Sequence, residues 1–148
     1  SKWAQTLPEA QRPVFAQVDS LRQAAQEVES VWKFALTDEN TRKLQDFALN
    51  VSNTLALECE WSWQDQVDGA RQGNSKGKRL TRWVEAQGGS MKDVIAFGDN
   101  QNDISMLEAA GTGVAMGNAI DEVKARANVV IGENTEDSIA QFIYTHLL

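Results

Sequence analysis

The chain has 148 residues, of which 42% are hydrophobic, and its formal net charge is −7. This length allows one or two small domains with a real core, and the acidic balance argues against nucleic acid or an anionic membrane as the main partner. Cys59 is the single cysteine, so an intrachain disulfide is excluded. Because no signal peptide and no long apolar segment occurs, we expect a cytoplasmic protein.

The first part of the chain predicts a mixture of short elements. Residues 1–13 hold both prolines and are interpreted as mostly loop. We expect a short strand over 14–18 and a helix over 21–28. Apolar residues then alternate with others over 31–36, which is typical of a strand packed against a core.

A helix and a second strand complete this region. Apolar residues recur at helical spacing between 44 and 55, and Thr37 or Asp38 is placed to cap that helix. Over 57–63, apolar and polar residues alternate strictly, which predicts an amphipathic strand. The region 14–72 therefore predicts an α+β layer, with helices over one face of a mainly antiparallel sheet. Three tryptophans are interpreted as core or interface residues, because each buries a large area: Trp32, Trp61 and Trp63.

From Gly73 onward the pattern changes to alternating helices and strands. Ser75 is a plausible N-cap for a helix that ends at Gly88-Gly89. The final helix is expected after Asn134 or Thr135. Between these two helices we predict strands over 94–97, 113–116 and 128–131, and helices beginning at 104 and 120. This alternation indicates a parallel sheet with crossover helices.

The stretch from 93 to 117 organises this region. Its apolar run predicts a buried parallel strand, Gly98 stops the run, and a polar loop with the carboxylates Asp99 and Asp103 follows. Gly111 is placed to close the next helix as a C′ residue. Open α/β sheets bind ligands at the carboxyl ends of their strands, and two carboxylates there suit Mg²⁺. On spacing alone, a turn role for Asp99 and a helix-capping role for Asp103 explain the pattern equally well.

Lys76 is a second candidate. It lies at a predicted helix start, where a positive charge and free backbone N–H groups together favour a phosphate. Taken alone, the residue is explained better as an ordinary surface lysine, because lysines are mostly exposed.

The segment 98–103, GDNQND, resembles the GDxxND motif of the haloacid dehalogenase-like phosphatases. The flanking segments ISML and GVAMGNA resemble the Cof-type branch of that superfamily, and within it the bacterial pyridoxal-phosphate phosphatases. The similarity covers nearly the whole chain, although its specific motifs all follow residue 72.

The resemblance implies a role for four residues. Lys76 would be the catalytic lysine that bridges the substrate phosphate and a nucleophilic aspartate. Asp99 would be a direct Mg²⁺ ligand, Asn102 would contact the phosphate, and Asp103 would support the metal through water or through hydrogen bonds, so that both aspartates serve catalysis. The implied substrate is a small phosphorylated metabolite, with pyridoxal phosphate favoured and sugar phosphates next, hydrolysed through an aspartyl-phosphate intermediate.

One part of the family pattern is missing. The nucleophile lies in a DxDGT motif, and no Asp-x-Asp occurs in this chain. His146 lies in the last predicted helix, is interpreted as a surface residue, and cannot substitute. We therefore expect an α/β fold that combines part of an α+β cap domain, residues 1–72, with the C-terminal half of a Rossmann-like core, residues 73–148. We expect the chain alone to be inactive, and its partner to be either the missing N-terminal segment or another copy.

Two other functions use the same features. A non-catalytic α/β binding domain could retain the acidic pocket without turnover. A receiver-like domain phosphorylated on aspartate lacks support, because such domains carry their acidic pair early in the chain. The resemblance implies that the cap selects the substrate, and we expect part of the cap to be absent, so pyridoxal phosphate and sugar phosphates both stay open.

Overall fold

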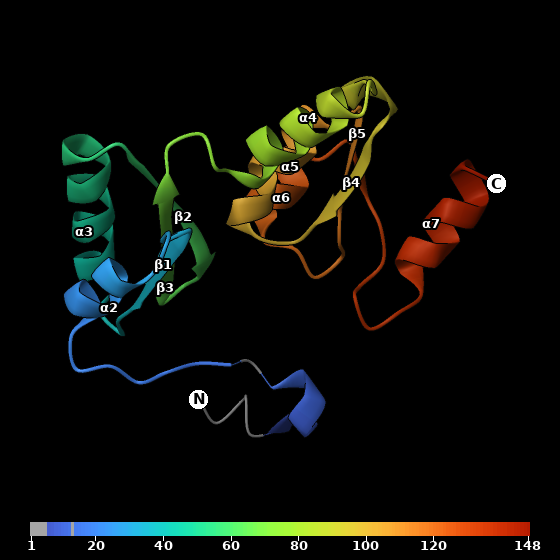
Figure 1. Cartoon of the computed structure of the whole chain (residues 1–148). Coiled ribbons are helices and arrows are strands. Elements are labelled where there is room, and N and C mark those ends of the chain that lie inside the picture. The colour runs from blue at the N-terminus through green and yellow to red at the C-terminus, as the bar shows by residue number, and fades with distance from the viewer. Residues whose placement is uncertain (1–5, 13) are drawn as a thin grey trace. The chain divides into compact units, whose positions relative to one another are not determined.

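The computed structural model describes residues 6–12 and 14–148. The chain forms two compact units, one within the first 31 residues and one from Trp32 to Leu148 (Figure 1). Within the described residues, no helix combines the length and the apolar character needed to cross a membrane.

The first unit contains a short 3₁₀ helix, η1 (Glu9–Gln11), and the helix α2 (Leu21–Glu27). Ser20 caps α2 by accepting a hydrogen bond from the backbone N–H of Gln23. The helix predicted over 21–28 is therefore confirmed. The strand predicted over 14–18 is wrong: that segment has no regular secondary structure, and Val14 and Phe15 are exposed. A strand needs a neighbour for its backbone groups. Within residues 6–12 and 14–148, no strand pairs with this segment.

The second unit begins with an antiparallel sheet. Its strands β1 (Lys33–Thr37), β2 (Leu57–Trp63) and β3 (Gln66–Arg71) lie in the order β1-β3-β2. The sequence pattern did not predict β3, although it is the central strand and its Val67 is fully buried. The mainly antiparallel sheet that was predicted is confirmed.

Helix α3 (Thr41–Thr54) covers one face of this sheet (Figure 1). Leu44 and Ala48 of the helix form a small core with Val67 of β3. The N-cap is Asn40, whose side chain accepts from the backbone N–H of Lys43, so the predicted caps at 37 and 38 are wrong. Asp38 instead accepts from the Asn40 backbone.

The tryptophans divide into two groups. Trp61 packs against the small core under α3, as predicted. Trp32 and Trp63 are 73% and 68% exposed, so the interpretation as core residues is wrong for both. A register shift between Trp61 and Trp63 gives them different surroundings on one strand.

The second sheet is parallel, with strands β4 (Ile95–Gly98), β5 (Thr112–Ala115) and β6 (Val129–Val130) in the order β4-β5-β6. Its helices are α4 (Lys76–Ala86), α5 (Ile104–Ala109), α6 (Asp121–Arg126) and α7 (Ser138–His146). The core beside this sheet includes Leu107, Ala115 and Val123, all nearly or fully buried. The predicted parallel sheet with crossover helices is confirmed.

Local sequence patterns predicted some of the helix caps correctly and others not. Ser75 caps α4 as predicted, its hydroxyl accepting from the Lys78 backbone at 3.4 Å. Gly111 has no left-handed backbone; a Cβ there would collide with the Lys92 backbone, so glycine serves a close approach and not a C′ turn. The N-cap of α7 is Asp137, so the caps predicted at 134 and 135 are wrong. His146 is exposed, as expected, and its ring stacks on Phe142.

Each sheet lies on one side of the composition change at Gly73. The compact unit from Trp32 to Leu148 nevertheless contains both sheets. The division into a cap portion, residues 1–72, and a core portion, residues 73–148, therefore stays a prediction. Below, "cap sheet" means β1-β3-β2 and "core sheet" means β4-β5-β6.

Candidate active site

The acidic loop follows the carboxyl end of β4. Asn100 caps the short 3₁₀ helix η3 (Gln101–Asp103), and the Asp103 carboxylate accepts hydrogen bonds from the backbone N–H groups of Asp99 and Asn100 at 3.0 and 3.2 Å. A Cβ on Gly98 would lie 2.5 Å from the Asp103 Cβ. Glycine at 98 therefore lets the carboxylate fold back onto the start of its own loop.

Asp103 is the buried carboxylate of the loop, with 5% of its surface exposed. Its Oδ1 forms an ion pair with the Nζ of Lys76, the first residue of α4. Burial alone raises the pKa of Asp103, but the hydrogen bonds from Lys76 and from the two backbone N–H groups outweigh it and hold the pKa below its ordinary value. Asp103 is therefore a fixed negative charge that holds the lysine ammonium in place.

Asp99 has a different environment from Asp103. Its carboxylate lies at the exposed surface, and among the described residues its side-chain hydrogen bond is a long one, 3.5 Å from the Nδ2 of Asn118. Asn118 is itself positioned, because its Oδ1 accepts from the Asn134 backbone at 2.9 Å. The oxygens of Asp99 are thus available to a cation, whereas those of Asp103 already have partners.

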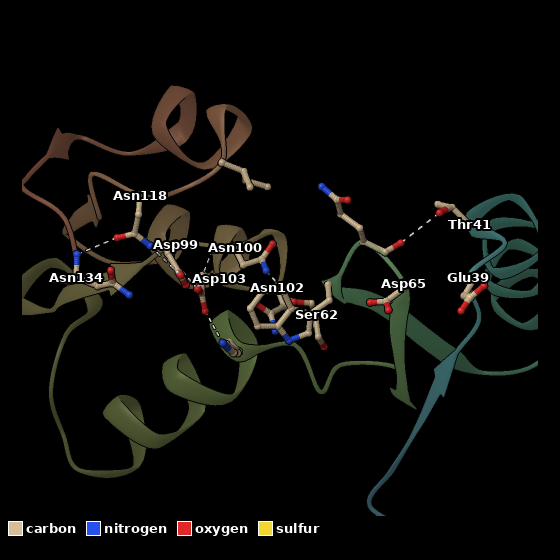
Figure 2. A pocket seen from close by; sticks show the side chains of 14 residues that line it. Glu39, Thr41, Ser62, Asp65, Asp99, Asn100, Asn102, Asp103, Asn118 and Asn134 are labelled. Atoms are coloured by element: carbon tan, nitrogen blue, oxygen red, sulfur yellow. Dashed lines mark hydrogen bonds and ion pairs between the residues drawn. The ribbon is translucent and has the colours of Figure 1, made fainter. Parts of the chain in front are cut away.

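The two carboxylates and Lys76 line an open cleft of about 920 Å³. Figure 2 shows Asp99, Asn102 and Asp103 together on one side, and Glu39 and Asp65 on the other. Residues from the loops of the core sheet form the first wall: Lys76, Asp99, Asn100, Asn102, Asp103, Asn118, Ile120 and Asn134. Residues from β2, its turn and the start of α3 form the second wall: Glu39, Thr41, Ser62, Trp63, Gln64 and Asp65.

One hydrogen bond joins the two walls directly. The Nδ2 of Asn100 donates to the backbone carbonyl of Ser62 at 2.7 Å. The Ser62 hydroxyl donates to Asp68 of β3 at 2.6 Å. Together with Lys33 and Gln66, this bond outweighs the effect of burial and lowers the pKa of Asp68. The end of β2 is therefore attached both to the acidic loop and to its own sheet.

The residues of the loop suit a hard divalent cation. Among residues 6–12 and 14–148, no three carboxylate, histidine or cysteine side chains gather as a complete metal centre. Mg²⁺ does not need one, because it keeps several waters and binds through one or two carboxylates together with a substrate phosphate. Asp99 offers a carboxylate of this kind, and the set of oxygen donors therefore fits Mg²⁺.

All four candidate site residues lie in the same cleft: Lys76, Asp99, Asn102 and Asp103. Their individual roles stay predictions. Sequence reasoning missed three contributors, Ser62, Asn100 and Asn118. Asn100 was visible inside the motif, but the two others become site residues only through contacts across the chain.

A family model described as haloacid dehalogenase-like hydrolase matches residues 1–143. The chain belongs to this family. Among curated relatives of this family member, pyridoxal phosphate phosphatase YbhA of Escherichia coli is 72% identical over 148 residues. A Bacillus subtilis 5-amino-6-(5-phospho-D-ribitylamino)uracil phosphatase, YwtE, is 43% identical over 70 residues, which is 47% of this chain.

Solved structures agree with the family. A haloacid dehalogenase-like hydrolase from B. subtilis matches with a TM-score of 0.80 and 30% identity, over 90% of this chain and 47% of the other. The subclass IIB sugar phosphatase BT4131 matches with a TM-score of 0.69 and 27% identity, over 84% and 45%. The chain spans 54% of its E. coli relative and 24% of the B. subtilis uracil phosphatase.

Proposed function

We propose that the chain is part of a Mg²⁺-dependent phosphatase that hydrolyses a small phosphomonoester. The observation that carries this proposal is the arrangement at the end of β4, where a lysine ammonium held by a buried aspartate shares a cleft with an exposed aspartate. Phosphoryl transfer requires charge neutralisation and positioning at one point, and this arrangement provides both.

Each residue has a part in the proposed reaction. Lys76 binds a phosphate oxygen and stays oriented through its pair with Asp103. Asn102, on the same wall, donates to another phosphate oxygen. Mg²⁺, when bound at Asp99, neutralises the charge of the phosphoryl oxygens. An aspartate carboxylate from outside this chain attacks phosphorus, and the ester P–O bond breaks as the leaving oxygen takes a proton from water. A second water then hydrolyses the aspartyl phosphate, which releases inorganic phosphate and restores the carboxylate.

The free edge of β4 is the place for that aspartate. Within the described residues, β4 pairs with β5 on one side only. A further parallel strand on the other side would end beside Gly98, so that a residue following it would lie next to Asp99. We assign this position to the strand that carries the nucleophile.

The proposed substrate is pyridoxal phosphate or a sugar phosphate. The first choice is supported by the 72% identity to the E. coli phosphatase of pyridoxal phosphate, and the second by the structural likeness to a sugar phosphatase. In this proposal, residues 1–72 contribute to a substrate-selecting cap and residues 73–148 to the catalytic core.

The test uses residues 1–148 joined to the N-terminal remainder of the E. coli relative, a product called here the restored protein. We expect phosphate release from pyridoxal phosphate in millimolar Mg²⁺, loss of release with a chelator, and recovery when Mg²⁺ is added back. Tight binding of phosphorylated compounds without release in any divalent cation would instead favour a non-catalytic binding domain.

A further inference from the structure

Trp63 is a large aromatic side chain in a cleft whose other lining side chains, apart from Ile120, are polar or charged. It is 68% exposed and lines the same cleft as Lys76 and Asp99. It also lines an adjoining open groove of about 450 Å³, together with Trp61 and Ile120. Trp32 and Trp83 are exposed to a similar extent, so the position of Trp63 at the cleft, and not its exposure alone, points to a role.

The strand places this side chain through an irregularity. Trp61 pairs with Val67, the register shifts, and Trp63 pairs with Gln66. In a regular strand the two indoles would share a face, because side chains alternate with a period of two. Bulges re-aim side chains and are over-represented beside active sites. Here Trp61 remains packed on the core under α3, and Trp63 borders the cleft.

The backbone next to Trp63 is held by two hydrogen bonds of Ser62, one to the acidic loop and one to β3. The carbonyl of the preceding Ser62 accepts from Asn100, and the Ser62 hydroxyl donates to Asp68. The indole therefore projects from a fixed point beside the acidic loop. A rigid aromatic side chain on a fixed backbone loses little conformational freedom when a ligand packs on it.

Elsewhere the cleft offers the ammonium of Lys76, which attracts an anionic group, and amide and hydroxyl side chains that can form hydrogen bonds with it. A ligand that fits both walls has a phosphate at Lys76 and a flat, weakly polar body at Trp63. We propose that Trp63 is the stacking platform for the planar ring of an aromatic phosphomonoester, which makes it a specificity-determining residue. This inference rests on the proposed phosphatase function and narrows its substrate class to ring-bearing phosphate esters over acyclic or sugar phosphates.

The test compares two substrates in the restored protein. Pyridoxine phosphate presents a planar ring without the aldehyde that would form imines with lysines, and glycerol phosphate presents no ring. We expect Trp63→Leu to lower kcat/KM for pyridoxine phosphate about tenfold, mainly through KM, as expected for loss of one stacking partner. Glycerol phosphate should change by less than about twofold. Trp63→Phe should retain most of the ring preference.

Trp83 provides the matched control. It is 64% exposed on α4 and lies outside the side chains that line the cleft, so Trp83→Leu removes a similar indole with no effect on either substrate. An equal loss for both substrates in Trp63→Leu, or no loss for either, would overturn the platform role.

Failure of the phosphatase function gives a different result. If the restored parent protein hydrolyses neither ester, the proposed function is wrong, and equilibrium dialysis of pyridoxine phosphate against the restored protein tests Trp63 on its own. Weaker binding in Trp63→Leu but not in Trp83→Leu still supports the platform. Equal binding by the parent and both variants contradicts it.

Discussion

The core sheet and the cap sheet both border the cleft, but they hold their side chains by different means. On the core side, the loop from Asp99 to Asp103 carries the carboxylates, and Asp103 fixes Lys76 through an ion pair supported by backbone hydrogen bonds. On the cap side, side chains project from the end of β2, and a side-chain hydrogen bond from Asn100 joins that end to the loop. In the proposed function, the wall with the ion pair carries the chemistry, and the other wall presents the surface that selects a substrate.

The largest effect is expected on the core side at Asp99. In the restored protein, Asp99→Asn removes the carboxylate that is available to Mg²⁺, so phosphate release should fall about a hundredfold or more at saturating Mg²⁺. Asp93→Asn is the control, because Asp93 is exposed and lies just before the start of β4, whereas Asp99 follows its end. Near-parental turnover in Asp99→Asn would contradict the metal assignment.

Lys76 should rank next. Lys76→Ala should lower kcat by about two to three orders of magnitude, since it removes one preorganised charge from the transferring phosphoryl group. It also removes one partner of a buried carboxylate, at a cost of about 1–3 kcal/mol in the free energy of unfolding. Lys78→Ala, which breaks only an exposed pair with Glu58 at 3.4 Å, should leave kcat within a few-fold of the parent. If the two variants had equal kcat values, Lys76 would be an ordinary surface lysine.

The link between the two walls should produce a smaller effect. Asn100→Ser keeps a side-chain acceptor for the start of η3 but is too short to reach the Ser62 carbonyl. Loss of that hydrogen bond should lower kcat/KM by up to about tenfold, which corresponds to the net free energy of one hydrogen bond. The measurement is a comparison of kcat and KM, and we expect most of the change in KM, because the cap wall moves while the catalytic charges remain. A change confined to kcat would place Asn100 with the catalytic wall.

The smallest effect concerns two carboxylates that pair across the cap sheet, Glu60 and Asp68. Burial, followed by the neighbouring charge of Glu58, raises the pKa of Glu60 above 4.5, so its ionisation destabilises the fold as pH rises through the raised pKa. The pKa of Asp68 lies below 3.8, so its stabilisation is present above that pH and is lost as pH falls further.

Thermal unfolding as a function of pH checks this difference. Glu60→Gln should raise Tm by at most a few degrees at pH 7, and the gain should vanish below pH 4.5. Asp68→Asn should lower Tm at pH 7, with a gap that narrows in acid. A lower Tm for Glu60→Gln at neutral pH would contradict this, because it would show that the Glu60 carboxylate stabilises the fold at that pH.

The sequence was most informative where a local pattern is compatible with one secondary structure only. The apolar run before Gly98 and the spaced helix after the polar loop predicted β4 and α5 closely, and Ser75 was identified as a cap. The loop between them was predicted as polar, but not its 3₁₀ helix η3. Strand β3 escaped prediction because Gln66–Arg71 carries a single strongly apolar residue, Val67, and a glycine. Gly69 is required by the ring of Phe34 on the neighbouring strand, a contact that no local pattern shows.

The rest of the site depends on contacts between distant residues. The support of the metal by Asp103 through water or hydrogen bonds stays a prediction; what the sequence did not show is that its oxygens accept from Lys76, 27 residues away, and from nearby backbone N–H groups. Asn40 could not be distinguished from Thr37 or Asp38 as a cap, because all three are polar and only the backbone path decides. The exposed position of Trp63 follows from a register shift that strict alternation does not predict.

The central claim is that this chain supplies Lys76 and Asp99 to a phosphatase site that it cannot complete. The most direct measurement is phosphate release from pyridoxal phosphate in millimolar Mg²⁺, by residues 1–148 alone and by the restored protein. We predict release only from the restored protein, and its loss in Asp99→Asn. Release by residues 1–148 alone that Asp99→Asn abolishes would contradict the claim, because it would show that the chain contains its own nucleophile.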